Sequence, residues 1–426
     1  MAGVTHRLFL KDRDLEDAKK SKYLFENTGR YKLDLEGFTN IVLFLLIAVT
    51  TIFQDTAYHN YFQLLFYVFV CLGGYYIIKN DRIRFTKYTI CMVIFFIWNE
   101  ISAGIMINKY YSVSDTMDLI MLATVFAVLL DNYVDTENKR FVMVLGMAVS
   151  GLLVTLSMLT SETFNLTGSE RILVEGVNPN AMGITICFSV LCCLYIFTKC
   201  KYLERKILCI ILVSILLVMG VLTASRKTLI GEALVVVIFF GMECYNKRKV
   251  DRWLLFLCIG TLLVMATYIA IVEIPAFDIV ERRMEELFKP QDELKETYHE
   301  TSVRYTMIDA AKMLFDDNYL FGAGMSSFLY WWGGYSHNNY WELLANYGII
   351  GLCLFYFPIV YEGIKTLIKK DRNSTDSFKV AGIVLLMFLS VGYVMIYERI
   401  AVVYILLLLA VTDKEKIKDS KSKYIK

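Results

Sequence analysis

The chain contains a succession of apolar stretches, each close to the length that an α-helix needs to cross a membrane. A helix of about 20 residues spans a hydrocarbon core of about 30 Å. Twelve such stretches lie near residues 38–53, 61–78, 88–106, 116–130, 141–159, 181–197, 207–222, 228–243, 253–273, 340–364, 380–396 and 400–412. Because a backbone in lipid must satisfy its own hydrogen bonds, this pattern predicts an all-α polytopic membrane protein with about twelve transmembrane helices. Only "YER" at 397–399 separates the last two stretches, so a re-entrant pair is the alternative there.

The composition agrees with a membrane protein and gives no sign of a nucleic-acid-binding one. Hydrophobic residues make up 57% of the 426 residues, against roughly 45–50% in soluble domains. The formal net charge is only +2, so no bulk attraction to nucleic acid is expected. The first 37 residues are charged throughout and lack the apolar core of a cleavable signal peptide, so we expect a cytoplasmic tail.

Lysine and arginine residues set the predicted orientation. Of the 44 Lys and Arg residues, 33 lie in the N-terminal tail, in alternate connections and in the C-terminal tail. Such residues gather on the cytoplasmic side of membrane proteins, so both termini are predicted to be cytoplasmic. All ten cysteines fall in predicted helices or cytoplasmic connections, which gives no indication of a disulfide framework. The predicted parts are a cytoplasmic tail (1–37), nine helices (38–273), an external connection (274–339), three helices (340–412) and a basic cytoplasmic tail (413–426).

The long external connection contains two amphipathic segments. Apolar residues recur at helical spacing in both, at Ile279, Val280, Met284, Leu287 and Phe288 in the first and at Val303, Met307, Ala311 and Leu314 in the second. We expect both segments to lie on the membrane or on the helix bundle and to roof a cavity. Glycines follow at 322, 324, 333 and 334, where the backbone can approach a ligand closely. The aromatic residues among them are either interfacial anchors or platforms that stack on sugar rings.

Three polar features lie at the predicted outer ends of helices. His337 and Asn338 stand directly before the stretch that starts near 340. Arg226, in "TASRK", follows the stretch that ends near 222 and either snorkels to the interface or has a partner there. The loop before residue 181 carries Arg171 and the turn "NPN" at 178–180, which is either an ordinary turn with a helix cap or part of a site.

Four sequence pieces together resemble the bacterial O-antigen polymerase and O-antigen ligase superfamily. The segment "SHNNYWELLANYGIIG" resembles its shared signature of a histidine, a small polar residue, nine residues and a G-x-x-G, here His337, Asn338, Gly348 and Gly351. The segment "SVRYTMIDAAKMLFDDNYLFGAGMSSF", which contains Arg304, Gly322 and Gly324, resembles its arginine-led external helix and G-x-G. "TASRK" and "VNPNAMG" resemble two further family motifs. All four occur in the family's order, between Arg171 and Phe357.

The resemblance implies a multispanning, GT-C-like glycosyltransferase that transfers an oligosaccharide from undecaprenyl diphosphate at the outer face of the bacterial cytoplasmic membrane. Arg226 and Arg304 are assigned to the diphosphate, because a guanidinium donates paired hydrogen bonds to phosphate oxygens. His337 is the expected catalytic residue, as a base for the acceptor hydroxyl or as a donor to the departing phosphate, and a helix-capping role is the alternative. Candidate acceptor or sugar contacts are Arg171, Asn178, Asn180, Tyr335 and Asn338. Gly348 and Gly351 are expected to permit close helix contact, and neither a cofactor nor a metal ion is expected.

A polymerase of surface polysaccharide, either O-antigen or capsule, is the favoured function. An O-antigen ligase or a protein oligosaccharyltransferase of the same superfamily is the alternative, because these enzymes share the signature. A transporter or flippase of lipid-linked sugars is a second alternative, suggested by intramembrane charges at Glu100, Glu232, Glu342 and Glu398. The expected partners are the lipid-linked donor, a growing polysaccharide or lipid-linked acceptor, membrane lipids, a chain-length regulator and a flippase.

Overall fold

A computed structural model describes residues 34–53, 58–79, 83–105, 113–164, 172, 174–246 and 299–410. Within these ranges only the backbone is described at 103–105, 113–119, 299–305 and 399. By its contacts the chain divides into two units, Met1–Thr39 and Asn40–Lys426. Of the first unit, residues 34–39 are described, and they form the beginning of a helix whose N-terminus is capped by Asp34, which accepts from Gly37 N at 2.8 Å. The statements that follow concern the second unit.

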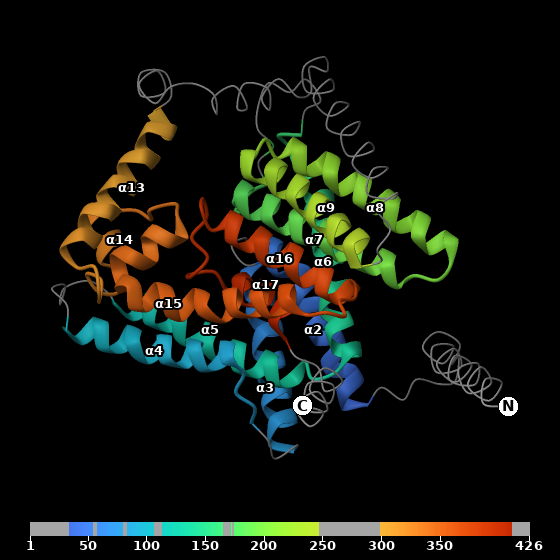
Figure 1. Ribbon diagram of the computed structural model, residues 1–426, viewed down its shortest axis with the longest axis horizontal. Helices are drawn as coiled ribbons and strands as arrows, with labels where there is room; N and C mark the ends of the chain where they lie inside the picture. The colour runs from blue at the N-terminus through green and yellow to red at the C-terminus, as the bar shows by residue number, and fades with distance from the viewer. Residues whose placement is uncertain are drawn as a thin grey trace. The chain divides into compact units, whose positions relative to one another are not determined.

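The described chain is helical, and its helices follow one another as labelled in Figure 1. In chain order they are α2 (Leu35–Phe53), α3 (His59–Lys79), α4 (Lys87–Ile105), α5 (Val113–Tyr133), α6 (Glu137–Leu159), α7 (Pro179–Lys199), α8 (Leu203–Leu222), α9 (Arg226–Asn246), α13 (His299–Asp317), α14 (Ser327–Trp332), α15 (Asn339–Ile368), α16 (Ser374–Leu389) and α17 (Arg399–Leu409). Helices lie over eleven of the twelve predicted apolar stretches, and the ninth, near 253–273, lies outside the described residues. The all-helical prediction therefore holds for the part of the chain that is described.

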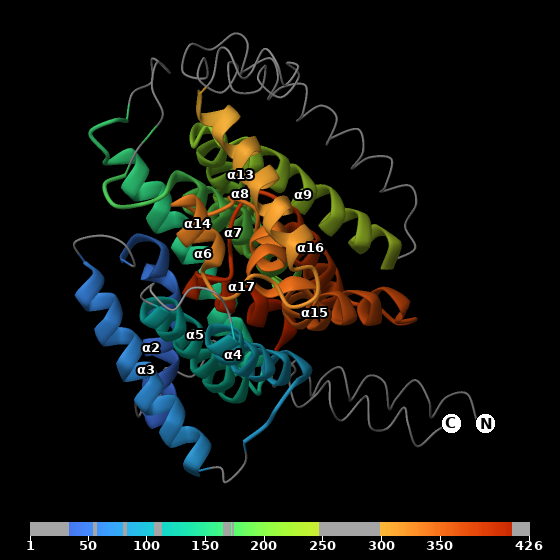
Figure 2. The same cartoon turned by 90° about the vertical axis from the view of Figure 1, so that its left-hand side faces the viewer.

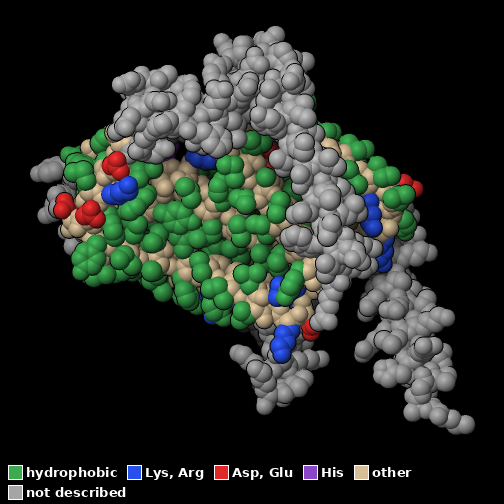
Figure 3. All heavy atoms as spheres, turned by 45° about the horizontal axis from the view of Figure 1, so that its top comes forward, with side chains coloured by type: hydrophobic (Ala, Val, Ile, Leu, Met, Phe, Trp, Pro, Cys, Tyr) green, Lys and Arg blue, Asp and Glu red, His purple; other side chains and the backbone are tan. Residues whose placement is uncertain are grey.

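Seven of the described helices are long and apolar enough to cross a membrane. They are α2, α3, α6, α7, α8, α9 and α15, while the apolar parts of α5 and α17, Ile120–Tyr133 and Ile400–Leu409, are shorter. Figure 3 shows hydrophobic side chains over most of the described surface in view, with the visible charged side chains gathered toward its margins. Such a surface fits lipid rather than water, so the chain is a polytopic membrane protein.

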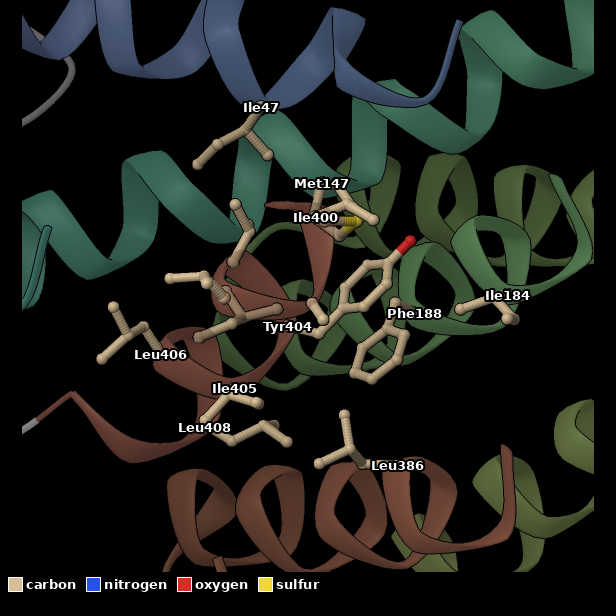
Figure 4. Packing of buried hydrophobic residues seen from close by; sticks show 14 of the residues in the cluster. Ile47, Met147, Ile184, Phe188, Leu386, Ile400, Tyr404, Ile405, Leu406 and Leu408 are labelled. Carbon is tan, nitrogen blue, oxygen red and sulfur yellow. The ribbon is translucent and has the colours of Figure 1, made fainter. Parts of the chain in front are cut away.

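Helix α7 forms the centre of the core. It contacts α6, α8, α9 and α16, and most of its residues are buried. The rings of Phe188 on α7 and Tyr404 on α17 stack in parallel with their centroids 4.1 Å apart, among aliphatic side chains (Figure 4). The Tyr404 hydroxyl lies 2.9 Å from Thr185 Oγ1, which in turn lies 2.7 Å from Thr51 Oγ1 on α2. The buried hydroxyls thus satisfy one another, as polar groups at membrane depth must.

One end of the helices, here called the lysine-rich end, is held by buried ion pairs. Lys139 in the first turn of α6 lies 2.9 Å from Asp135 and donates to Tyr76 on α3. Lys379 in α16 lies 3.1 Å from Glu362 near the C-terminal end of α15. These charges are paired where they are buried, which offsets the cost of removing them from water.

The opposite end, here called the motif end, carries the sequence motifs. Helices α7, α9, α15 and α17 begin there, and α8 and α16 end there. The predicted stretch 380–396 is wrong in its second half, because α16 ends at Leu389 and residues 390–398 form a non-helical connection to α17. Side chains of other elements bond part of its backbone: Met395 N and Ile396 N donate to Asn339 Oδ1, and Gly392 O accepts from Lys227 Nζ.

Helix α13 coincides with the second predicted amphipathic segment and lies on the helix bundle. It contacts α14 and α15, and Figures 1 and 2 both show it beside them. Its apolar face, with Met307, Ala311 and Leu314, packs against Phe328 of α14 and Ala345 of α15. The first predicted amphipathic segment, 276–289, lies outside the described residues.

Candidate functional site

His337 lies at the tip of a tight turn directly before α15. Its backbone has φ +55° and its side chain is exposed, whereas the flanking Ser336 and Asn338 are buried. Ser336 Oγ donates to Asn338 O at 2.8 Å and accepts from Asn338 N at 3.3 Å. The two neighbours are thus bonded to each other across the histidine. This arrangement presents the imidazole outside a turn that is fixed from within.

Asn338 and Asn339 both serve the backbone. Asn338 Oδ1 accepts from Tyr340 N at 3.0 Å and from Trp341 N at 3.2 Å, so Asn338 is the N-cap of α15. Asn339 Oδ1 accepts from Met395 N at 2.8 Å and from Ile396 N at 3.1 Å. The sequence made Asn338 a candidate acceptor or sugar contact, and the structure places the side-chain oxygens of both asparagines in bonds to the backbone.

Glu342, one turn further along α15, is fully buried among three donors. Its Oε2 accepts from Ser336 N at 2.8 Å, and its Oε1 accepts from Asn346 Nδ2 at 3.0 Å and Tyr397 OH at 3.2 Å. Burial and the neighbouring carboxylate raise the pKa of the Tyr397 phenol well above its usual range, so the hydroxyl keeps its proton. The predicted contact residue Tyr335 is exposed, with its ring centroid 5.2 Å from that of Tyr397.

The motif glycines join the connection between α13 and α14 to a break in α15. The backbone of α15 leaves the helical conformation at Gly348, with φ 65° and ψ −165°. Ala323 N and Gly324 N donate to Ala345 O and Asn346 O at 2.8 and 2.9 Å. On the other side of the break, Ile349 N and Ile350 N donate to Tyr319 O and Leu320 O at 3.0 and 3.4 Å. We call this arrangement of residues 319–324 and 345–350 the glycine joint.

Two glycines are required by the closeness of this joint. A Cβ at Gly322 would overlap the backbone of Tyr347, and one at Gly348 would overlap Leu320 O. Both residues also have positive φ, at +75° and +65°. Gly348 therefore breaks α15 and leaves room for the backbone of Leu320. The sequence predicted a contact between helices at this position instead. A Cβ at Gly351 would overlap Tyr347 and lie 3.6 Å from Phe95 of α4.

The turn "NPN" and the segment "TASRK" lie together at the motif end. Asn178 caps α7 by accepting from Asn180 N at 2.9 Å, and Ser225 Oγ donates to Asn180 Oδ1 at 3.4 Å. Arg226 is the first residue of α9 and is half-buried, and Lys227 Nζ donates to Gly392 O. We call the turn between α8 and α9, residues 223–227, the Arg226 hairpin. The N-terminus of a helix carries a partial positive charge, so this hairpin favours an anion.

The connection between α16 and α17, residues 390–398, is the common partner of the His337 turn and the Arg226 hairpin. On one side Asn339 N donates to Ser390 O at 2.9 Å, besides the bonds of Asn339 and Glu342 to Met395, Ile396 and Tyr397. On the other side Lys227 bonds Gly392 O. Sequence reasoning missed this connection because its residues continue the apolar run of α16, although Ser390 and Gly392 mark the point where the helix ends.

A small pocket lies beside this connection. It is lined by Thr51, Ala181, Ile184, Thr185, Tyr393, Glu398, Ile400 and Tyr404. Ala181 follows Asn180, so the pocket adjoins the turn "NPN". Its wall combines aliphatic groups, hydroxyls and one carboxylate.

The remaining predicted contact residues are placed in part. Arg304 lies in the N-terminal half of α13, where only the backbone is described, and Arg171 lies outside the described residues. Among the described residues, no three His, Cys, Asp or Glu side chains are grouped as metal ligands would be.

The helices and the gathered motifs define a polytopic helical membrane protein whose candidate site lies at one end of the bundle. Residues 211–356 match the family model described as O-antigen ligase, a family of glycosyl-transferring ligases and polymerases. This match confirms the resemblance to the O-antigen polymerase and ligase superfamily, and the matched region contains Arg226, Arg304 and His337. A comparison with curated proteins found no match.

Proposed function

We propose that the protein joins undecaprenyl-diphosphate-linked oligosaccharide units into a surface polysaccharide, O-antigen or capsule, at the outer face of the bacterial cytoplasmic membrane. The observation that carries this proposal is the shared connection 390–398, to which the His337 turn and the Arg226 hairpin are both bonded. A histidine and a cationic helix N-terminus at the same end of a membrane bundle suit a lipid-linked diphosphate.

Diphosphate chemistry determines what each side chain has to supply. The bond between the anomeric carbon and the diphosphate oxygen breaks, a glycosidic bond to the acceptor oxygen forms, and the acceptor hydroxyl loses its proton. Diphosphate is already a good leaving group, so the protein must mainly bind its charge and orient the acceptor. Arg226 supplies a guanidinium beside the N-terminus of α9, and Arg304 in α13 is the second proposed phosphate ligand.

His337 is the proposed proton-handling residue, because it is exposed at the tip of its turn. An unperturbed histidine has a pKa of about 6.5, so this residue type can take up or release a proton near neutral pH. As a base it must be neutral, so activity would fall as the pH drops through the histidine pKa. As a donor to the departing phosphate it must be protonated, so activity would fall as the pH rises. The pH profile of the chain-extension rate therefore distinguishes the two roles.

The direct test is His337→Ala in the purified protein with undecaprenyl-diphosphate oligosaccharide. We expect chain extension to fall by about 10²- to 10⁴-fold, the range for loss of general acid or base catalysis. Binding of the lipid donor should remain close to that of the wild type, because the arginines carry the diphosphate. His59→Ala is the matched control, since His59 lies in α3 and bonds Gln63. Chain extension by His337→Ala at the wild-type rate would show that His337 has only a structural role in its turn.

The acceptor separates this proposal from its alternatives. A polymerase extends chains with the lipid-linked unit as its only sugar substrate, whereas a ligase requires a lipid A core and an oligosaccharyltransferase requires a protein. A flippase would move the lipid-linked unit across a vesicle membrane without forming a glycosidic bond. Binding to a chain-length regulator or a flippase belongs to the polymerase proposal. We also expect EDTA to leave the rate unchanged.

A further inference from the structure

The buried carboxylate of Glu342 is bonded to three separate parts of the motif end. It accepts from the main chain of Ser336, immediately before His337. It accepts from the phenol of Tyr397, in the connection to α17, and from the amide of Asn346 on its own helix. Its side chain has no exposed surface, so water does not compete for these bonds. In all three bonds the Glu342 carboxyl group is the acceptor.

The bond to Ser336 N holds the backbone of the His337 turn directly. His337 adopts φ +55°, a conformation that costs a non-glycine residue free energy and persists only when its surroundings hold it. Ser336 N is held by Glu342, and Asn338 is held by its capping bonds at the start of α15. The turn is therefore fixed on both sides of the histidine.

The bond to Asn346 extends the same network to the connection between α13 and α14. Asn346 Oδ1 accepts from Phe328 N at 2.9 Å, and Asn346 O accepts from Gly324 N at 2.9 Å. Through Asn346 and Tyr397, Glu342 thus ties the His337 turn to the glycine joint and to connection 390–398.

We propose that Glu342 is a positioning residue for His337, which sets the place of the imidazole relative to the groups that bind the lipid diphosphate. This inference rests on the proposed function, because it assumes that His337 handles the proton. It also explains a carboxylate that sequence reasoning took as a sign of transport. Glu342 is fully buried near a helix end and accepts from three donors of the protein itself, which gives it a structural partner set that transport does not require.

The test is Glu342→Gln, which keeps the shape of the side chain but replaces one acceptor with a donor. We expect kcat for chain extension to fall by about 10- to 100-fold, since a misplacement of about 1 Å can cost 10²-fold. KM for the lipid donor should stay within about twofold. Glu362→Gln is the matched control, because Glu362 is a mostly buried glutamate on the same helix that accepts from Lys379 at the lysine-rich end. This control should leave both constants unchanged.

A double-mutant cycle separates positioning from general stability. If Glu342 acts through His337, Glu342→Gln should reduce the residual rate of His337→Ala by less than about twofold. An equal fall in both backgrounds would overturn the proposal. If His337→Ala is as active as the wild type, the proposed function and this inference both fail. If His337→Ala is inactive and Glu342→Gln keeps the wild-type kcat, only this inference fails.

A milder variant keeps the proposal testable should Glu342→Gln fail to accumulate. Tyr397→Phe removes one donor and leaves the carboxylate and its other two bonds in place. It should lower kcat by about threefold to tenfold, less than Glu342→Gln does, because only one of the three hydrogen bonds is lost. An unchanged kcat in Tyr397→Phe would count against the network.

Discussion

Single residues at the motif end have backbone conformations that few side chains tolerate. Gly348 combines φ 65° with ψ −165°, a region that is almost restricted to glycine. His337, by contrast, is a non-glycine residue at φ +55°. The glycine has its conformation because it has no Cβ, whereas the histidine keeps its conformation because bonded neighbours hold it. The same end of the bundle therefore contains one position that excludes side chains and one that presents a side chain.

Gly348→Ala should be strongly destabilising. The backbone region alone costs about 1–3 kcal/mol, and the new Cβ would overlap Leu320 O. We expect a loss of about 3 kcal/mol or more, seen as a lower midpoint of thermal unfolding in detergent. Gly334→Ala is the control, because a Cβ there meets only the end of Met307, at 3.6 Å. Equal midpoints for the two variants would show that the glycine joint does not stabilise the protein.

Arg226→Lys tests the proposed diphosphate contact at the same scale. Lysine keeps the charge but loses the planar pair of donors, so we expect KM for the lipid donor to rise by about tenfold. Normal accumulation in the membrane should accompany this loss. Arg205→Lys, an exposed arginine near the start of α8 at the other end of the bundle, should leave KM unchanged. A wild-type KM in Arg226→Lys would remove the bidentate assignment.

At the scale of elements, connection 390–398 holds the motif end together. It bonds the start of α15 through Asn339 and the start of α9 through Lys227. Its own helices, α16 and α17, run back into the core, where α16 contacts α7 and α9. A non-helical connection thus holds two motifs in place relative to each other, although they lie more than 100 residues apart in the chain.

Asn339→Ala measures what this connection contributes. The substitution leaves Met395 N, Ile396 N and the Tyr356 hydroxyl without their partner, at about 1–3 kcal/mol for each buried group that finds no other. We expect a loss of about 2–5 kcal/mol in the free energy of unfolding, as measured by chemical denaturation. Asn246→Ala, which removes a 3.0 Å bond to Ser377 at the lysine-rich end, should cost about 1 kcal/mol. Losses of the same size would contradict a special role for the connection.

The elements were predictable from the sequence to the extent that apolar length defines them. Runs of apolar residues located eleven helices, because lipid and buried core both select the same side chains. The end of α16 at Leu389 was not predictable in this way, since Val391, Tyr393 and Val394 continue the run. The sequence also identified His337 and Arg226 as candidates. The role of Glu342 required the structure, because its donors come from three separate segments.

At the scale of the whole molecule, the charge distribution predicts how the protein lies in the membrane. The connections predicted to be cytoplasmic hold 33 of the 44 Lys and Arg residues. In the structure, buried Lys139 and Lys379 lie at one end of the helices, and His337 and Arg226 lie at the other. Both observations favour an outward motif end.

Reporter fusions test this orientation. A reporter placed after Lys249 or at the C-terminus should read as cytoplasmic, and one inserted near Gln291 should read as external. The physical reason is that Lys and Arg residues near helix ends resist transfer across the membrane and therefore stay on the cytoplasmic side. An external C-terminus would reverse the assignment and place His337 on the cytoplasmic side, where the proposed polymer could not be assembled.

The glycine joint has a consequence for biosynthesis. An unpaired backbone group costs several kcal/mol in lipid, so the broken α15 is a poor membrane segment until its partner is in place. That partner, residues 319–324, precedes α15 in the chain and has already been synthesised when α15 leaves the ribosome. The order of the segments therefore lets the helix acquire its break as it inserts, without waiting for any later part of the protein.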